Sequence, residues 1–347
     1  MPHPIRSIPS ARPELPTATT KLRFLKRADS SLASEDDALI LAIRAELLGR
    51  PNIVEEDDCG EADAILMHES WAFREWRYID KLLADPVISR YSPKVYTVNN
   101  DDAATGLLRG AYSCLPARRF DADLHVAVPF LARPNEEVLA HAGKSPGEAR
   151  CLGVWRGNPH SNRKLRGQLL QLYGGSENFQ VESTDSWKDH GKQEKLRYVQ
   201  MLRSGKFSLC PGGWAPATIR TYESMAVGVA PVIIADEFVL PRGPDWPAFS
   251  LRVKEADLPS LEAILEQHAD RHEAMGALAY EAWHRYFRPE RLIGYYADML
   301  MECVRTSASI GTPTTETARW RSPSMYRNNG WTVGQRLWNR ASRLLRA

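Results

Sequence analysis

The sequence of 347 residues contains no apolar run of about 18 residues, the length that a transmembrane helix needs. Its first twenty residues also lack the apolar core of a secretory signal, and they are rich in proline, serine and threonine. A segment of that composition has little apolar surface to bury. We therefore expect no membrane-spanning helix, and we expect residues 1–20 to be poorly ordered.

The sequence has almost no net charge, +2 at pH 7, so the chain as a whole has little electrostatic attraction for nucleic acid. It has only five cysteines, and no two of them form a CxxC pair. This spacing is typical of reduced thiols in a cytosolic protein rather than of a disulfide framework or a zinc site. We therefore expect a cytoplasmic protein that does not bind nucleic acid.

The sequence does contain a regular alternation of strand-like and helix-like segments. In its first part, strands are expected in ADAILMHE from Ala62, KVYTVNNDD from Lys94 and DLHVAVPF from Asp123, and a helix is expected over 34–48. A second series has strands in RCLGVWRG, FQVES, KFSLC and FSLRV, with helices between them. This alternation predicts two parallel α/β halves, joined by the polar stretch 131–150.

Parallel α/β sheets bind ligands outside the carboxyl ends of their strands, and the stretch PGGWAPATIRTYESMAVGVAPVIIAD follows one such strand. We expect Pro211, Gly212 and Gly213 to form a turn that brings the backbone close to a ligand. The next helix would begin near Pro216 and end before Gly228. Its amino end has free N–H groups and a partial positive charge, which favour a phosphate.

Arg220 and Glu223 lie on one face of this predicted helix, because they are three residues apart. An arginine there can hold a diphosphate through two hydrogen bonds, and a glutamate can accept bonds from ribose hydroxyls. The same spacing fits a solvent-exposed helix pair worth roughly a few tenths of a kcal/mol. Neither a Walker A loop nor a GxGxxG fingerprint occurs in the sequence.

The run FSLCPGGWAPATIRTYESMAVGVAPVIIADEFVLP, followed by DWPAFSLRV, resembles the exostosin-type glycosyltransferases, glycosyltransferase family 47. In that family a strand ends in a Pro-x-Gly turn, and Ser/Thr-x-Arg-x-x-Glu, Gly-x-x-Pro-Val-Ile, an acid and Leu-Pro follow. The matching residues are Thr218, Arg220, Glu223, Gly228, Pro231, Val232, Ile233, Asp236, Leu240 and Pro241, and further on Asp245, Trp246, Phe249 and Ser250. The motif covers the C-terminal third of the chain, and the N-terminal half fits the family more loosely.

The resemblance implies a GT-B fold of the α/β class, in which two Rossmann-like domains face each other across a cleft. It implies an acceptor domain over 21–140, a nucleotide-sugar domain over 150–290, and a returning helix with a basic tail over 291–347. The implied function is an inverting, metal-independent glycosyltransferase without a cofactor. It would move a sugar from a nucleotide-diphosphate donor to a glycan or lipid-linked glycan in polysaccharide or glycoconjugate synthesis. The alternatives are a nucleotide-sugar epimerase of GT-B fold and a non-catalytic partner in glycan assembly.

Donor binding is then predicted for residues at several strand ends. They are Arg220, Glu223, Gly212, Gly213, Thr218, Arg156, Arg163 and Asp236. Arg156 and Arg163 belong to VWRGNPHSNRKLR, where a strand end leads directly into a helix start, whereas Arg166 is expected on a basic surface face. Some animal members carry an arginine where this chain has Gly212, so the resemblance does not identify the donor.

An inverting transfer needs a base that takes the proton of the acceptor hydroxyl, and in a GT-B enzyme it should come from the N-terminal domain. His68 and Glu69 end one predicted strand, and Asp101 and Asp102 end another. Asp101 is the preferred candidate by its position, and His68 is the second. Each of these residues could instead cap the helix or turn that follows it.

Three other features have simple structural explanations. Asp121-Ala122-Asp123 matches the metal-binding DxD motif of other glycosyltransferases, but it precedes a strand, and we predict no metal site. Cys210 is expected to be a small buried residue without an activating histidine. Trp214 either stacks on a base or sugar or only covers the turn.

The tail ARWRSPSMYRNNGWTVGQRLWNRASRLLRA is rich in arginine and tryptophan and contains no acid. Its last part could form an amphipathic helix. The apolar side would consist of Trp331, Leu337, Trp338, Leu344 and Leu345. This pattern suits peripheral contact with an anionic membrane surface, at the inner face of the membrane, and it equally suits a helix that packs back on the first domain.

Overall fold

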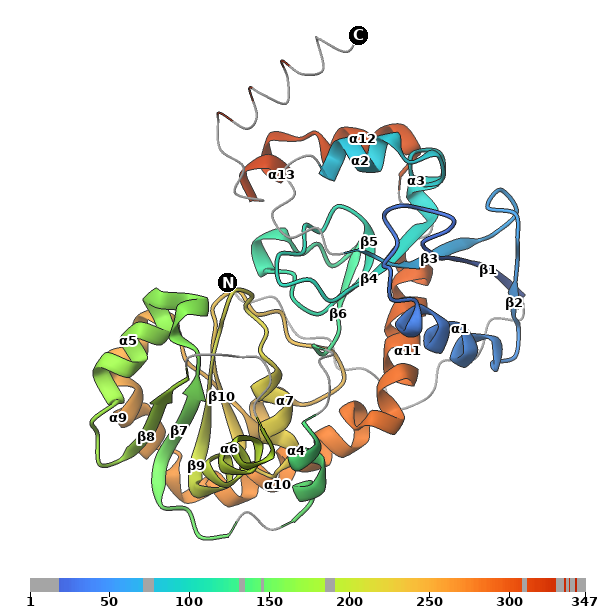
Figure 1. Cartoon of the computed structure of the whole chain (residues 1–347). Coiled ribbons are helices and arrows are strands. Elements are labelled where there is room, and N and C mark those ends of the chain that lie inside the picture. The colour runs from blue at the N-terminus through green and yellow to red at the C-terminus, as the bar shows by residue number, and fades with distance from the viewer. Residues whose placement is uncertain are drawn as a thin grey trace.

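The computed structural model describes residues 19–70, 78–130, 135–144, 147–184, 191–307 and 311–328, with the single positions 334, 337 and 341. These residues form two α/β halves, each built on its own parallel sheet (Figure 1). Residues 1–18 and most of the tail, including four of the five apolar tail residues named above, lie outside the described residues. The expectations for those segments therefore stay predictions.

The first half contains a six-stranded sheet in the order β2-β1-β3-β4-β5-β6. Its strands are β1 (Thr20–Leu25), β2 (Ile53–Glu55), β3 (Ala64–His68), β4 (Val95–Asn99), β5 (Arg109–Tyr112) and β6 (His125–Ala127). All neighbouring strands are parallel, and Ile65 of β3 pairs with Val95 of β4. Strands β3 and β4 lie in the middle of the sheet and are covered on both faces, so they consist mostly of apolar residues. This pattern allowed both strands to be predicted from the sequence.

Three helices belong to the first half. They are α1 (Ala38–Leu48), α2 (Tyr78–Ala84) and α3 (Pro86–Tyr91). The helix that was predicted over 34–48 begins only at Ala38. The N–H of Ser34 bonds to the carbonyl of His68, which ties the residues just before α1 to the end of β3. Strands β1, β2 and β5 were not predicted.

The second half contains a five-stranded parallel sheet in the order β11-β10-β9-β7-β8. Its strands are β7 (Cys151–Gly157), β8 (Phe179–Ser183), β9 (Gly205–Pro211), β10 (Ala230–Ile234) and β11 (Leu251–Arg252). The chain runs from β7 outward to β8 and then returns to place β9 on the other side of β7. The strand order thus reverses between β7 and β9, and this is the point where open α/β sheets form a crevice for ligands.

The helices of the second half cover both faces of its sheet (Figure 1). They are α5 (Arg163–Tyr173), α6 (Lys192–Ser204), α7 (Ile219–Ala226), α8 (Trp246–Phe249), α9 (Leu261–Glu266) and α10 (His272–Ala282). On α5, Leu165, Leu169 and Tyr173 recur at four-residue spacing and are buried, as expected of an amphipathic helix. The stretch expected to be a linker contains α4 (Glu136–His141), which packs against α6 and α7.

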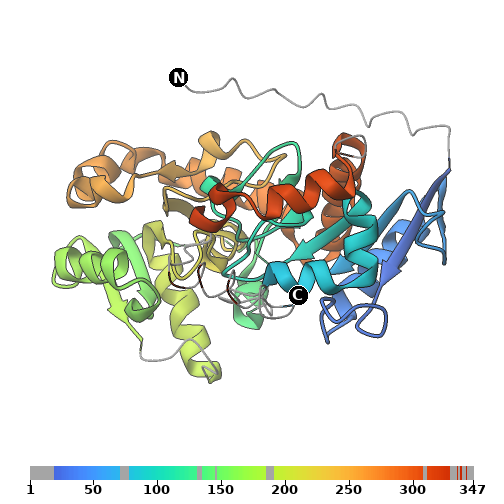
Figure 2. The same cartoon turned by 90° about the horizontal axis from the view of Figure 1, so that it is seen from above.

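The chain ends by returning to the first half. Helix α11 (Pro289–Ser307) packs against α1 and β5, and α12 (Pro313–Trp320) lies beside α3 (Figures 1 and 2). Glu316 of α12 forms a buried ion pair with Arg109 of β5, with 2.9 Å between Oε1 and Nη2. A last short helix, α13 (Pro323–Asn328), follows. The predicted α/β fold of two parallel-sheet halves with returning C-terminal helices is confirmed.

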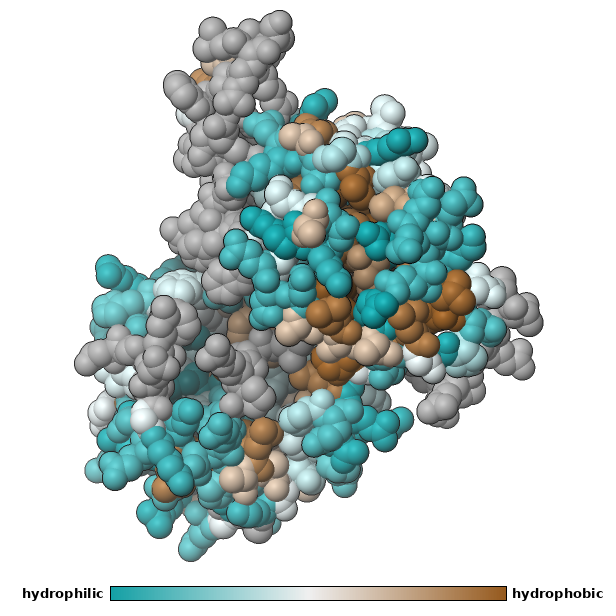
Figure 3. Space-filling view, turned by 45° about the vertical axis from the view of Figure 1, so that its right-hand side comes forward, coloured by the Kyte–Doolittle hydropathy of each residue, from teal (hydrophilic) through white to brown (hydrophobic). Residues whose placement is uncertain are grey.

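One apolar core cluster joins the two halves, because it contains residues of α1, α7 and α11 together. On the face shown in Figure 3 the surface is mostly hydrophilic, with apolar residues gathered in one region. No helix within the described residues has both the length and the apolar character needed to cross a membrane. All five cysteines are free thiols.

Candidate functional site

The loops that follow β7 and β9 lie next to each other at the reversal point of the second sheet, since these strands pair through Val154 and Ser208. The loop after β7 contains a short 3-10 turn (Pro159–Asn162) and leads into α5. The loop after β9 contains Gly212 and Gly213 and leads into α7. Both helices therefore begin at the same crevice, as the sequence predicted.

Arg166 holds these two loops together. Its Nε donates to the carbonyl of Gly212 at 3.1 Å and its Nη2 to the carbonyl of Pro211 at 3.1 Å. Its Nη1 donates to the carbonyl of Asn158 at 3.1 Å and to the hydroxyl of Ser161 at 2.6 Å. The prediction that Arg166 lies on a basic surface face is wrong, because the helix turns its side chain into the crevice.

Burial and the nearby charge of Arg220 lower the pKa of Arg166 to about 9. A guanidinium in such a place is poorly solvated, so it gains more than a surface group from an anionic ligand. Arg163, one turn earlier on α5, is exposed instead. Its role in donor binding stays a prediction.

The glycine turn is tighter than the sequence suggested. The N–H of Gly212 bonds to the carbonyl of Ile234, and the N–H of Gly213 bonds to the carbonyl of Ala215. Both N–H groups already have partners within the protein, so in this conformation they are not available to a ligand, and a donor-binding role of Gly212 and Gly213 stays a prediction. A Cβ on Gly213 would lie 2.9 Å from Nη2 of Arg166, which explains this glycine.

Arg220 is 7% exposed and points from α7 into the crevice. Its Nη2 donates to the carbonyl of Arg156, and its guanidinium carbon lies 5.7 Å from the ring centroids of Trp155 and Tyr198. Its buried Nε has no hydrogen-bond partner among the described residues. Arg220 is therefore not part of a solvent-exposed helix pair, and its guanidinium is held by a backbone carbonyl and two aromatic rings.

Glu223 lies one turn further along α7 and accepts a hydrogen bond of 2.6 Å from the hydroxyl of Tyr198. Burial raises the pKa of Glu223, while that hydrogen bond and the charge of Arg220 act in the opposite direction. The Tyr198 partner comes from α6 and could not be identified from spacing. Arg220 and Glu223 thus lie side by side at the crevice, both in contact with the same tyrosine.

The other predicted donor residues are placed less closely. Arg156 forms ion pairs with Glu182 at 2.6 Å and with Glu194, so its side-chain charge is already balanced. Thr218 precedes α7 without capping it through its side chain. Asp236 is exposed and accepts the N–H of Glu255 at 3.1 Å, which joins the loops after β10 and β11.

The candidate bases lie at the carboxyl edge of the first sheet. Asp101 is 1% exposed, and its Oδ1 accepts the N–H of Ala103 at 2.8 Å. Glu69 is also buried, and it accepts bonds from the hydroxyl of Tyr78 and, at 2.7 Å, from the amide of Asn99. Burial raises the pKa of Glu69. Neither carboxylate is open to an incoming hydroxyl group in this conformation.

Asp102 and His68 are more accessible. Asp102 is half-buried, with its Oδ1 3.9 Å from the thiol of Cys114. Burial and the charge of Asp101 raise the pKa of Asp102, and the charge of Arg166 in the second half lowers it. The ring of His68 instead lies 3.2 Å from the carbonyl of Asp36, at the side of the sheet that α1 covers, and burial lowers its pKa.

A direct contact joins the two sheet edges. The backbone N–H groups of Ala117 and Arg118, in the loop after β5, donate to the carbonyl and to the carboxylate of Glu237, each at 2.9 Å. Glu237 belongs to the loop after β10. The carboxyl edges of the two sheets therefore face each other, with Asp102 on one side and Arg166 on the other.

The remaining candidates have structural roles. Asp121 accepts the N–H of Asp123 at 3.0 Å in the turn before β6, and no group of three potential ligands within the described residues could hold a metal ion. Cys210 is buried, and burial raises the pKa of its thiol. Trp214 is 52% exposed at the mouth of the crevice.

Comparisons with known proteins agree with the resemblance. The exostosin GT47 domain model matches residues 115–268, which contain β7 to β11 and the whole crevice of the second half. A probable glucuronosyltransferase of Oryza sativa subsp. japonica is 40% identical over 107 residues, 30% of this chain and 23% of that protein. The probable glucuronoxylan glucuronosyltransferase IRX7 of Arabidopsis thaliana is 36% identical over 110 residues, 31% of this chain and 22% of that protein.

The chain thus spans about a quarter of the length of these curated relatives. Among solved structures, a glycosyltransferase from Rickettsia africae matches with a TM-score of 0.38 and 8% identity, over 83% of this chain and 99% of that chain. The strand order and pairing described above establish the fold, because a TM-score of 0.38 is too low to support it. The predicted resemblance is confirmed, because residues 115–268 of this chain match the exostosin GT47 domain model.

Proposed function

We propose that the protein is a glycosyltransferase that moves a sugar from a nucleotide-diphosphate donor to a glycan or lipid-linked glycan. The observation that carries this proposal is the pair of poorly solvated guanidinium groups, Arg166 and Arg220, at the reversal point of the second sheet. A diphosphate is the ligand class that such a pair recognises best, because guanidinium and phosphate form strong charge-assisted hydrogen bonds.

We propose a contact for each part of the donor. The diphosphate would contact Arg220 and the amino end of α7, where the first N–H groups of the helix have no partner within it. Glu223 would accept bonds from the hydroxyls of the ribose or of the sugar. The exposed ring of Trp214 offers a surface on which a base can stack. Arg156, Arg163, Thr218 and Asp236 would act at the margin of the site.

The chemistry we propose is a single displacement with inversion. The oxygen of an acceptor hydroxyl forms a bond to the anomeric carbon, and the bond from that carbon to the diphosphate oxygen breaks. The electron pair leaves with the diphosphate, whose negative charge Arg220 stabilises. Asp102 takes the proton of the acceptor hydroxyl. Asp102 replaces Asp101 as the preferred base, because Asp101 is buried in its own turn.

We also propose that the reaction needs no metal ion, since two arginines supply positive charge where the diphosphate would lie. The cytoplasmic location and the contact of the basic tail with an anionic membrane remain proposals drawn from composition alone. The tail helix would otherwise extend the packing of α12 and α13 on the first half.

The test is a transfer assay with Arg220→Ala. UDP-glucuronate is the first donor to try, because the curated relatives are named probable glucuronosyltransferases, with xylo-oligosaccharides as the first acceptors. Loss of one charged contact to a developing anion costs on the order of 10²–10³-fold in kcat. The matched control is Arg163→Ala, which removes an exposed arginine at the margin of the site and should change the rate less than about threefold.

The configuration of the product and the effect of a chelator complete the experiment. Inverted product and full activity in EDTA support the mechanism, and retained configuration or a metal requirement contradicts it. Conversion of the donor sugar without an acceptor would identify an epimerase instead. A wild-type protein that binds nucleotide sugars but turns none over, across a panel of UDP-sugars and GDP-sugars, would be a non-catalytic partner.

A further inference from the structure

A pocket lies in the second half, at the opposite edge of the sheet from the loops that hold Arg166 and Arg220. It has a volume of about 390 Å³ and is formed by residues 143, 144, 147 and 149 between α4 and β7, the end of α6 with the start of β9, the turn before β10, and α10. These segments surround the amino ends of the strands, whereas the arginine crevice is at their carboxyl ends. The size is within the usual range for small-molecule sites, roughly 300–1,000 Å³.

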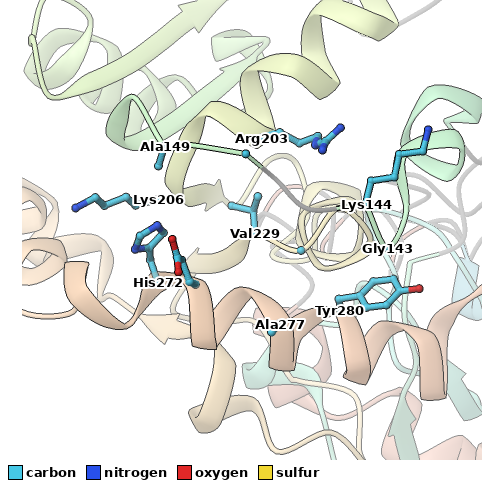
Figure 4. A pocket seen from close by; sticks show the side chains of 13 residues that line it. Gly143, Lys144, Ala149, Arg203, Lys206, Val229, His272, Ala277 and Tyr280 are labelled. Carbon is cyan, nitrogen blue, oxygen red and sulfur yellow. The ribbon is translucent and has the colours of Figure 1, made fainter.

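Basic side chains dominate the lining of this pocket. Lys144 and Lys206 are positively charged, Arg203 is basic but already has a partner, and Glu273 is the single acid among these lining residues. Figure 4 shows Lys206 and His272 at one end of the pocket and Lys144 at the other. Within the described residues, neither lysine forms an ion pair. The pocket therefore has an excess of positive charge that attracts an anion.

The wall between the basic groups is small and apolar. Val229 and Ala277 lie in the middle of the pocket, and the ring of Tyr280 closes the end near Lys144 (Figure 4). The Tyr280 ring is stacked on Trp283, with 6.1 Å between centroids, which fixes its orientation. A flat aromatic ring beside small side chains accommodates the apolar face of a six-membered sugar ring.

We propose that this pocket binds an anionic sugar residue, one whose ring carries a carboxylate or a phosphate. The ring packs on Tyr280 and Val229, and the anionic group binds the lysine side chain at one of the two ends of the pocket. A charge-neutral sugar lacks the second of these interactions, and inorganic phosphate lacks the first. The proposal is independent of the donor crevice, since the two sites lie at opposite edges of one sheet.

The test measures binding to the full chain by ligand-observed NMR and by isothermal titration. The probes are glucuronic acid and glucose 6-phosphate, with glucose and inorganic phosphate as the two partial ligands. We expect one of the two anionic sugars to bind at least about tenfold more tightly than glucose, because a hydrogen bond to a charged group is worth about 1.5–3 kcal/mol. The stronger of the two probes shows whether the anion is a carboxylate or a phosphate.

Variants place the binding in this pocket. Lys206→Ala and Lys144→Ala each remove the positive charge at one end of the pocket, and the variant at the end that holds the anion should weaken the preferred anionic sugar about tenfold or more. Lys144 is exposed, so its replacement does not put folding at risk. Lys192→Ala is the matched control, because Lys192 is an exposed lysine at the far end of α6, where binding should be unchanged. Arg220→Ala should also leave this binding unchanged, which separates the pocket from the crevice.

Three results would overturn the proposal. One is equal affinity for glucose and for both anionic sugars, and another is binding as tight for inorganic phosphate as for glucose 6-phosphate. The third is unchanged affinity in both Lys206→Ala and Lys144→Ala. In that last case, a fall in thermal stability would show that the basic groups only balance the negative carboxyl ends of α6 and α7.

Discussion

The carboxyl edges of the two sheets carry opposite charge, although both are built from parallel strands that end in short polar turns. At the edge of the first sheet, burial raises the pKa values of Glu69 and Asp102. At the edge of the second sheet, Arg166 and Arg220 line the crevice, and burial lowers the pKa of Arg166 to about 9. Both edges therefore hold charges in surroundings that solvate them poorly.

Neutral partners hold the charges in place on both sides. Glu69 accepts from a tyrosine hydroxyl and an asparagine amide, and Arg166 donates to carbonyl groups of two loops. These contacts orient a charged group without cancelling its charge. One architecture has thus produced an edge that carries buried arginines and an edge that carries buried carboxylates. The difference between the halves, rather than the fold they share, indicates which substrate each half would bind.

Removal of Asp102, the carboxylate that faces the arginines, should reduce catalysis more than any other change. We expect Asp102→Asn to lower kcat by about 10²–10⁴-fold, because that is the usual contribution of a general base. The KM for the donor should change little, since the donor binds at the other edge. Steady-state kinetics with varied UDP-sugar and varied acceptor separate the two effects.

Asp101→Asn is the matched control, since it removes the neighbouring charge with the same change of atoms. The asparagine oxygen can still accept the N–H of Ala103, so the turn is kept. We expect this variant to retain most of its activity. If Asp101→Asn is inactive while folded and Asp102→Asn is active, the base is Asp101 and the assignment from exposure is wrong.

The electrostatic link between the halves predicts a particular pH dependence. A base must be deprotonated, so kcat/KM should fall as the pH drops through the pKa of Asp102, which burial raises above its ordinary value. Arg166 lowers that pKa from across the crevice. Arg166→Met should therefore move the acid limb of the profile to higher pH, whereas Arg166→Lys should leave it close to that of the wild type.

A pH profile that does not move in Arg166→Met would show that the two edges act separately. Loss of the limb in Asp102→Asn would identify the titrating group. Because Arg166 also joins two loops, the donor KM is expected to rise in both Arg166→Met and Arg166→Lys. Only the pH at which the acid limb lies shows whether the charge of Arg166 acts on Asp102, in addition to its structural role.

The sequence was sufficient to predict the elements that carry periodic or family-specific signals. Strands β3, β4, β9 and β10 consist mostly of apolar residues, because both of their faces are covered. The end of α7 at Gly228 was also predictable, and this glycine has the positive φ of 74° that a left-handed helix end requires. The short strands β2 and β5 lack a long run of apolar residues.

The partners of the site residues could not be predicted, since they depend on how elements far apart in the sequence meet. Arg163 and Arg166 are equivalent by composition, and only the packing of α5 decides which of them enters the crevice. Asp101 and Asp102 are adjacent, and the turn after β4 buries the first and leaves the second half-buried. Tyr198 reaches Glu223 from another helix, with no signal in the sequence.

The exact position of the Arg220 guanidinium should have a smaller effect, which appears mainly in the donor KM. A Cβ on Gly157 would lie 3.2 Å from Nη2 of Arg220 and 3.1 Å from the ring of Trp155. Gly157→Ala should therefore push the guanidinium aside and raise the donor KM several-fold, with a smaller change in kcat.

Gly167→Ala in α5 is the control, because nothing lies within 4 Å of the added methyl group. That variant should keep the wild-type KM and gain up to about 1 kcal/mol of stability, since alanine favours a helix. An unchanged KM in Gly157→Ala would mean that Arg220 can shift without loss, and that the charge at the basic edge matters more than its exact position.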